Sequence, residues 1–226
     1  MAKWTFEPGH TAAEFRARHM MVTYVRGHFK DVHGSLEFDP ENPRNSLVEV
    51  KIDARKIWTG VKERDDHLRS ADFLDVEHHP EITFKGNQVE IKGEHDYAVT
   101  GDLTIRGVTR QVCLDVSYLG EWETPWWEDG VNKGPKTRAG FVATTKINRQ
   151  DFGVSWQDTM DRRGIVVGNE IDITIDAEAI LEDTRFSRTK RLLRFFRSES
   201  TYQNLVLGKR FIGKTSTEYL SVTAIT

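Results

Sequence analysis

The stretch TGVKERDDHLRSADFLDVEHHPEITF, residues 59–84, decides the fold because the spacing of apolar residues changes there from two to between three and four. Val61, Leu68, Ala71 and Leu74 would share one stripe of a helix, with charged residues over the rest of its surface. The stretch therefore predicts one short amphipathic helix. Leu68 and Leu74 are expected to be buried where this helix closes an open end of the remaining structure.

The rest of the chain predicts strands that each have one apolar face. Residues 47–53 are typical, because Val48, Val50 and Ile52 alternate there with charged residues. About eight or nine such segments follow one another through short turns, which is the organisation of antiparallel meanders. One helix cannot cover so much apolar sheet, so the apolar faces must cover each other in a barrel or a two-sheet sandwich. Long strands with inward Ala and Thr favour an all-β, lipocalin-like barrel of about eight strands, closed at one end by the helix of residues 59–75.

Three segments have less regular patterns. Residues 20–30 fit an extended segment or a short helical turn before Gly27. The dipeptide Gly86-Asn87 predicts the turn of a hairpin. Residues 121–138 predict a long loop, and long loops in compact domains are often functional. Three aromatic side chains either pin this loop to the body or line the mouth of a ligand site: Trp122, Trp126 and Trp127.

The composition excludes several classes of protein. A hydrophobic content of 38% over 226 residues is enough for a core, which excludes disorder over most of the length. The single cysteine, Cys113, excludes an intramolecular disulfide. The chain shows neither a basic start followed by an apolar run nor an apolar run long enough to cross a membrane. A soluble, cytoplasmic protein is therefore expected.

The net charge of -3 is distributed unevenly. Residues 184–226 hold nine Lys and Arg against two Glu, a net charge of +7. The preceding residues hold 23 basic and 33 acidic side chains, a net charge of -10, which argues against a nucleic-acid surface there. We expect a barrel domain over residues 1–183 and a basic tail outside the fold. Residues 185–197 have the composition of a basic amphipathic helix, which suits peripheral contact with an acidic membrane.

No arrangement of residues in the sequence requires catalysis or a metal ion. The eight histidines lack the spacing of a metal site, and no nucleophile elbow, phosphate-binding loop or dinucleotide fingerprint occurs. Cys113 has no obvious activating neighbour. An enzyme that acts on a small polar substrate stays open as an alternative, with His10, His19 and His67 as its candidate residues. A filled barrel that works through its surface is a third hypothesis.

Six motifs follow one another along the chain: PGHT at 8–11, RDDHLRS at 64–70, DFLD at 72–75, PEITF at 80–84, GDLTIRGVT at 101–109 and NRQDFG at 148–153. In this series the chain resembles the YceI-like family of lipocalin-like polyisoprenoid-binding proteins. The resemblance covers about residues 3–182 and is far more specific than any one motif. The tail from Thr184 falls outside it.

The resemblance implies a long apolar pore for a polyprenyl chain inside the barrel. It implies binding, storage or transport of a polyisoprenoid or an isoprenoid quinone, without catalytic residues, metal or cofactor other than the bound lipid. Many members of the family are exported, whereas this sequence shows no export signal. The expected partner is an apolar small molecule and not a nucleic acid; a homodimer stays open.

Inward-facing side chains of the strands supply the expected lining of this pore: Phe15, Leu36, Phe38, Val50, Ile52, Phe84, Leu103, Ile105, Leu114, Val116, Phe141, Ile173 and Ile175. Each of them would equally suit an ordinary filled core. Five residues are candidates for a polar head group or for the mouth of the pore: Arg64, His67, Arg69, Trp126 and Trp127.

The domain boundary generates a first prediction. A chain ending at Asp183 loses no predicted strand, so it should fold and bind its ligand as the full chain does. Binding to acidic vesicles, where the full chain shows it, should weaken because each basic residue near such a surface contributes about 1 kcal/mol. Thermal unfolding and vesicle flotation of both chains test this, and a melting temperature many degrees lower for the short chain would show that the tail packs into the body.

Overall fold

In the computed structural model, which describes residues 1–160 and 164–182, ten strands form one antiparallel sheet. Their bounds are β1 Ala2–Phe6, β2 Ala12–His19, β3 Thr23–Phe29, β4 His33–Phe38, β5 Leu47–Asp53, β6 Glu81–Ile91, β7 Asp96–Ile105, β8 Val108–Glu128, β9 Val131–Asn148 and β12 Val167–Leu181. A small separate sheet joins β10, Thr159–Met160, to β11, Gly164–Ile165. The tail expected over residues 184–226 lies outside the described residues, so the boundary at 183 stays a prediction.

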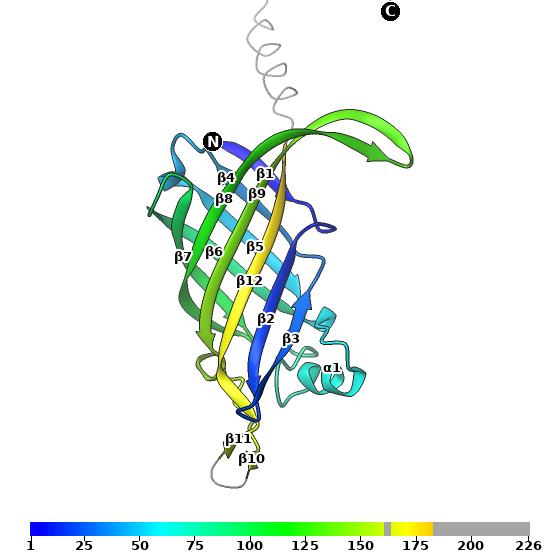
Figure 1. Cartoon of the computed structure of the whole chain (residues 1–226), viewed down its shortest axis with the longest axis vertical. Coiled ribbons are helices and arrows are strands. Elements are labelled where there is room, and N and C mark those ends of the chain that lie inside the picture. Colours follow the sequence, from blue (N-terminus) through cyan, green and yellow to red (C-terminus); the bar gives the residue numbers. More distant parts are fainter. Residues whose placement is uncertain (161–163, 183–226) are drawn as a thin grey trace, which may run out of the picture. The chain divides into compact units, whose positions relative to one another are not determined.

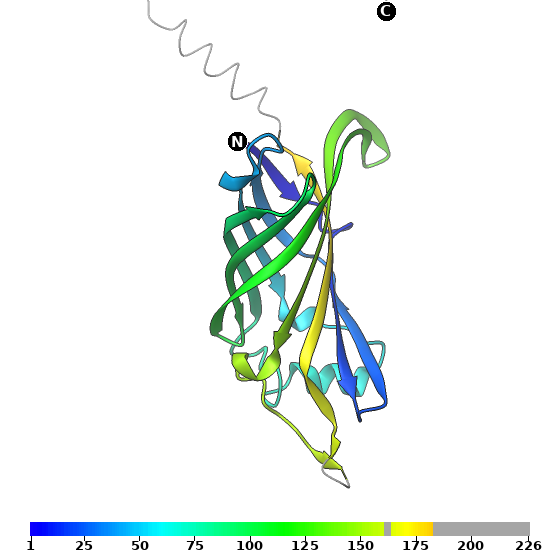
Figure 2. The same ribbon diagram turned by 60° about the vertical axis from the view of Figure 1, so that its left-hand side comes forward.

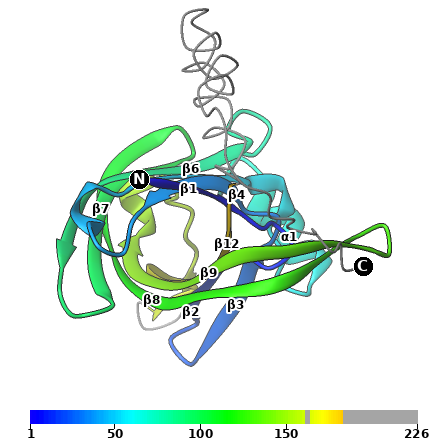
Figure 3. The same ribbon diagram turned by 90° about the horizontal axis from the view of Figure 1, so that it is seen from above.

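Eight of these strands close into a barrel, which confirms the predicted fold class. The hydrogen-bonded order is β1-β4-β5-β6-β7-β8-β9-β12, and β1 also pairs with β12 through Trp4 and Leu181. Figure 1 shows the strands running obliquely along the barrel, and Figure 3, the view from above, shows the ring around its interior. A closed ring leaves the apolar faces of all eight strands pointing at one another.

Two successive strands share one edge of β12. β1 pairs with Ala179–Leu181, whereas β2 pairs with residues 167–176. The chain changes direction between them, and the Thr11 hydroxyl donates to the Glu178 carbonyl and accepts from its N–H. β3 then pairs with β2 and extends the wall beyond the closed ring. β2 and β3 thus form a hairpin that reaches the lower end of the barrel in Figure 1.

The helix α1, Lys62–Arg69, and the residues around it complete the wall beside β3. The sheet does not continue from β3 to β5. Instead the segment before α1 bonds to β3, where His28 and Trp58 exchange two backbone hydrogen bonds of 2.9 and 3.1 Å. Ile57 and Phe73 are buried in the core at this place. Figures 1 and 2 show α1 beside β3 toward the lower end.

The helix is shorter than the 59–75 that the apolar spacing predicts. It ends at Arg69 because the Ser70 hydroxyl bonds the His67 carbonyl and the Asp72 N–H, a local pattern that competes with helix. Ala71 and Val61 are consequently exposed and do not belong to an apolar stripe.

The apolar contacts of this region come mainly from the turns after the helix. Phe73 and Val76 are buried, whereas Leu68 and Leu74 are half-buried against the same cluster. The expected packing of Leu68 and Leu74 over the barrel is therefore present, although neither side chain is fully enclosed.

Two of the segments with less regular patterns, residues 20–30 and residues 121–138, form strands over most of their length. Residues 23–29 form β3, so the helical turn before Gly27 is wrong. The chain reverses at Met20 and Met21, and this dipeptide gave no turn pattern in the sequence. The long loop over residues 121–138 is also wrong, because β8 and β9 run on as a two-stranded ribbon. Figure 2 shows this ribbon beyond the upper rim of the barrel.

The predicted hairpin at Gly86-Asn87 is wrong, because β6 runs unbroken through both residues with a register shift. Gly86 lies opposite Gly101 of β7. A Cβ atom on Gly101 would lie 2.3 Å from the Lys85 carbonyl oxygen and 2.5 Å from Gly86 Cα. The glycines therefore allow close approach of two strands.

No helix among residues 1–160 and 164–182 is long and apolar enough to span a membrane.

The contact between β6 and β7 generates a second prediction. Gly101→Ala should reduce the free energy of unfolding by at least about 2 kcal/mol, because its Cβ would meet fixed backbone atoms. Gly9→Ala is the control, since its Cβ would meet only a flexible carboxylate oxygen at 3.4 Å, and it should change stability by less than about 0.5 kcal/mol. Urea unfolding measures both values. Equal stabilities of the two variants would contradict the close approach.

Candidate ligand-binding cavity

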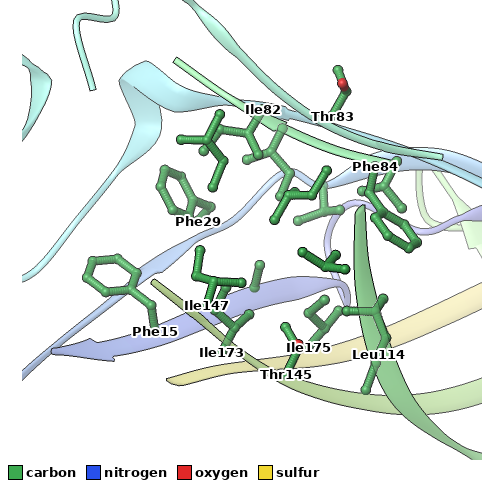
Figure 4. A pocket seen from close by; sticks show the side chains of 18 of the residues that line it. Phe15, Phe29, Ile82, Thr83, Phe84, Leu114, Thr145, Ile147, Ile173 and Ile175 are labelled. Carbon is green, nitrogen blue, oxygen red and sulfur yellow. The ribbon is translucent and has the colours of Figure 1, made fainter. Parts of the chain in front are cut away.

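The barrel encloses an apolar cavity of about 300 Å³. Its wall follows β12 from Val167 to Ala177, a path of roughly 30 Å at about 3.3 Å per residue. Figure 4 shows Phe29, Ile82 and Phe84 on one side of the space, with Ile173 and Leu114 on the other. The volume lies at the lower limit of small-molecule pockets, about 300 to 1,000 Å³.

The structure places all thirteen residues of the expected lining on the wall of this cavity: Phe15, Leu36, Phe38, Val50, Ile52, Phe84, Leu103, Ile105, Leu114, Val116, Phe141, Ile173 and Ile175. They come from β2, β4, β5, β6, β7, β8, β9 and β12. The period of two therefore identified the inward faces correctly. That these residues contact a ligand stays a prediction.

Some residues on the cavity wall were not predicted from the sequence. Phe29 belongs to β3, and its alternation with Val25 and Gly27 could have identified that strand. Phe73 comes from the turns after α1, whereas Phe152 comes from a 3-10 turn after β9. Neither position has a periodic neighbourhood in the sequence.

Three of the polar side chains on the wall, Thr11, Thr145 and Arg149, have hydrogen-bond partners within the protein. Thr11 bonds the backbone of Glu178, and the Thr145 hydroxyl donates to the Cys113 carbonyl at 2.8 Å. The Ser46 hydroxyl is buried and has no hydrogen-bond partner among the described residues. Burial raises the pKa of Tyr97, which favours its neutral form. The cavity thus offers a long ligand mainly apolar surface.

Arg149 is a charged residue on the cavity wall, and its hydrogen bonds are made to the protein itself. Its side chain is 4% exposed and donates five hydrogen bonds, four to backbone carbonyls and one to the Asn169 side-chain oxygen. The shortest run to Val154 at 2.7 Å and Trp156 at 2.8 Å. Burial lowers the pKa of Arg149, because the charged form loses hydration. The guanidinium fastens the segment after β9 to the start of β12 at the lower end.

The polar residues of the helix region stabilise that region and do not lie on the cavity wall. Arg64 donates to the hydroxyl and carbonyl of Thr59, and Asp65 accepts from the Thr59 N–H at 2.9 Å. Arg69 donates to the Arg55 and Ile57 carbonyls. These bonds hold the helix against the segment that precedes it.

The remaining head-group candidates also lie away from the wall. His67 bonds Asp72 at 2.9 Å, and its ring packs edge-on against Phe73 and Trp156. The half-buried Trp126 lies under the Arg138 guanidinium, and Trp127 is exposed on the ribbon. A role for these side chains in ligand binding stays a prediction.

The three histidines of the enzyme alternative do not converge on one site. His10 precedes β2 and His19 is its last residue, so the strand, roughly 23 Å long at about 3.3 Å per residue, lies between them. His67 is engaged with Asp72 on the helix. Among the residues that the structure describes, no three His, Cys, Asp or Glu side chains are grouped to hold a metal ion.

Comparisons with known proteins agree with this architecture. The model of the YceI-like domain family matches residues 4–179. A UPF0312 protein of Pectobacterium carotovorum is 39% identical over 153 residues, which cover 68% of this chain and 75% of the relative.

Two solved structures share the fold. The YceI protein of Campylobacter jejuni has a TM-score of 0.60 and 28% identity, over 74% of this chain and 90% of that one. A polyisoprenoid-binding domain from Saccharophagus degradans has a TM-score of 0.57 and 11% identity, over 80% of this chain and all of that one. At 11% identity the second likeness concerns the fold alone.

The buried guanidinium generates a third prediction. Arg149→Met should reduce the free energy of unfolding by at least about 3 kcal/mol, because several buried carbonyls lose their donor and each costs about 1 to 3 kcal/mol when unsatisfied. Arg110→Met is the control, since Arg110 is exposed and bonds one carbonyl at the surface. Denaturant unfolding compares them, and a loss below about 1 kcal/mol at Arg149 would show that the segment is held by other contacts.

Proposed function

The chain belongs to the YceI-like domain family, and we propose that its barrel binds, stores or carries a polyisoprenoid lipid without catalysing a reaction. The observation that carries the proposal is the continuous apolar wall along β12, from Val167 to Ala177. A barrel filled by its own side chains would leave no such space. The name of the Saccharophagus domain, polyisoprenoid-binding, supports the same class of ligand for this fold.

The energetics of an apolar chain suit this cavity. A buried CH₂ group contributes about 0.8 kcal/mol, so each five-carbon isoprene unit contributes roughly 4 kcal/mol. Association and ordering cost at least about 4 kcal/mol. Three buried units therefore leave roughly 8 kcal/mol, which corresponds to a micromolar Kd. A chain lipid can bind in this way with no charged contact at all.

The finer assignment is an isoprenoid quinone or a similar lipid with one polar end. Thr11, Thr145 and Arg149 are bonded within the protein, so these three side chains offer a polar ring little along the wall. The polar end would then lie at one end of the cavity with the prenyl chain inside. The proposal needs no metal or further cofactor, and the cytoplasmic location expected from the sequence stays a prediction.

The fourth prediction tests this function directly. An organic extract of the purified full chain should contain an apolar chain lipid when analysed by mass spectrometry. A prenyl quinone added to the delipidated protein should change its tryptophan fluorescence in a saturable way. If no apolar compound is extracted and the added quinone changes nothing, the proposed function is wrong.

A matched pair of variants locates the binding in the barrel. Ala143 faces the cavity between Val116 and Ile175, whereas the preceding Val142 lies on the other face of β9. Ala143→Leu should narrow the bore and weaken quinone binding by at least about tenfold, while Val142→Leu should bind as the wild type does. Equal affinities for both variants would place the ligand outside the barrel.

A further inference from the structure

We propose that the tip of the β2–β3 hairpin, Met20, Met21 and Val22, docks the barrel onto an anionic lipid bilayer. Val22 is 82% exposed, Met21 51% and Met20 43%. Three consecutive apolar side chains are thus exposed at the tip of the hairpin, and Figure 1 shows the β2–β3 hairpin reaching the lower end of the barrel. The proposal rests on the proposed function, because a protein that carries a membrane lipid must collect it from a bilayer or deliver it to one.

The backbone of this tip is strained, and outside the hairpin the Met20 N–H bonds the Val166 carbonyl at 2.9 Å. Met20 and Met21 have φ angles of 47° and 63°, and Val22 N–H bonds the His19 carbonyl at 3.1 Å. This is a turn with positive φ at both central residues, which favours Asn-Gly or Asp-Gly. A side chain in that conformation costs about 1 to 2 kcal/mol.

The other two turns of this kind in the described chain follow the usual rule. Arg106-Gly107 joins β7 to β8, and Asp129-Gly130 joins β8 to β9. Each places glycine at the second position, where φ is 71° and 75°. The Met20-Met21 turn therefore keeps a methionine at the second position, where the same chain elsewhere uses glycine, and the Met21 side chain is 51% exposed.

Basic and aromatic side chains surround the apolar tip. Arg18 donates to the Met21 carbonyl at 2.8 Å and lies 5.2 Å from the Tyr24 ring centroid. Arg16 lies 4.9 Å from the same ring, and Arg26 is exposed opposite Arg16. Tyr24 is 42% exposed, and tyrosine prefers the interface between water and lipid.

The charge of this surface is positive close to the tip. Two acidic residues lie farther back along β2 and β12: Asp172 pairs with Arg16 at 2.8 Å, and Glu14 stands opposite His28. Asp158 lies nearer the tip, because its carbonyl and the Met20 N–H both bond Val166. Arg18 and Arg26 are left to attract lipid phosphates, each contributing about 1 kcal/mol near an anionic bilayer. An apolar tip with a basic collar matches an anionic bilayer better than an apolar protein groove.

The tip also belongs to the part of the wall that the sheet does not close. Inward side chains of the hairpin, Phe15 and Phe29 among them, line the cavity. The outer edge of β3 is bonded near its far end by Trp58, and Trp58 is itself 54% exposed beside the His28 ring. Docking through the tip would bring this side of the barrel, where β3 is bonded by the segment before α1 and not by another strand, close to the lipids.

The fifth prediction uses a variant that improves the turn while removing its apolar side chains. The full chain and the double variant Met20→Asn, Met21→Gly are mixed with phosphatidylcholine vesicles with and without phosphatidylglycerol. We expect the wild type to float with the anionic vesicles and the double variant to bind at least about tenfold more weakly. Its melting temperature should be unchanged or higher, since Asn-Gly suits the turn.

Two single variants complete the experiment. Arg26→Gln should weaken vesicle binding about fivefold, as expected for one basic residue. Leu119→Thr, which removes a 61% exposed apolar side chain from β8, should bind as the wild type does. Wild-type vesicle binding by the double variant, or no vesicle binding by the wild type, would overturn the proposal.

The same samples separate this inference from the proposed function. The double variant should bind a prenyl quinone in solution as the wild type does, because neither methionine lies on the cavity wall. Loss of vesicle binding with intact quinone binding supports a docking role. Vesicle binding by a protein that takes up no quinone would contradict the proposed function and leave the docking surface in place.

Discussion

The pairing of β1 with both β4 and β12 is the constraint on which the rest of the structure depends. Trp4 pairs with Leu36 of β4 and with Leu181 of β12, so one short strand closes the ring of eight strands. Without it both neighbours would expose unpaired edges, which are prone to aggregation. Closure also fixes the circumference, and the inward side chains of eight strands must then share one interior.

That interior stays partly open because of which side chains face it. Small residues such as Ala13, Ala143 and Ala177 occupy inward positions among the larger ones. At one end Phe38, Tyr118 and Phe141 pack with their ring centroids 5.1 to 5.4 Å apart and form a second, dense core cluster. The barrel is therefore filled where aromatic rings meet and open along the aliphatic stretch between its ends.

The sequence predicted the parts of the fold that depend on period alone. Alternation along β5 and β12 identified inward faces, because a strand in a barrel has one apolar side whatever its neighbours are. Glycine was less informative, since it permits a turn as readily as a close approach. Gly86 was assigned to a turn, whereas its contact with Gly101 lies far away in sequence. The ribbon of residues 121–138 was missed because Pro125 and Gly134 occur within strands, where both are unusual.

The two errors that involve turns have different physical explanations, and the difference bears on function. At Gly86 the local rule fails because tertiary packing leaves little room for a side chain: a Cβ atom there would lie 2.8 to 2.9 Å from side-chain atoms of Val48, Phe84 and Val99. At Met20-Met21 the opposite occurs: the chain turns without a glycine, although glycine at the second position would relieve the backbone strain. Packing offsets only part of that cost, because both side chains are about half exposed. Strain that the fold does not need is expected where a protein meets something else, and the chemistry of two methionines and a valine beside arginines points to lipid.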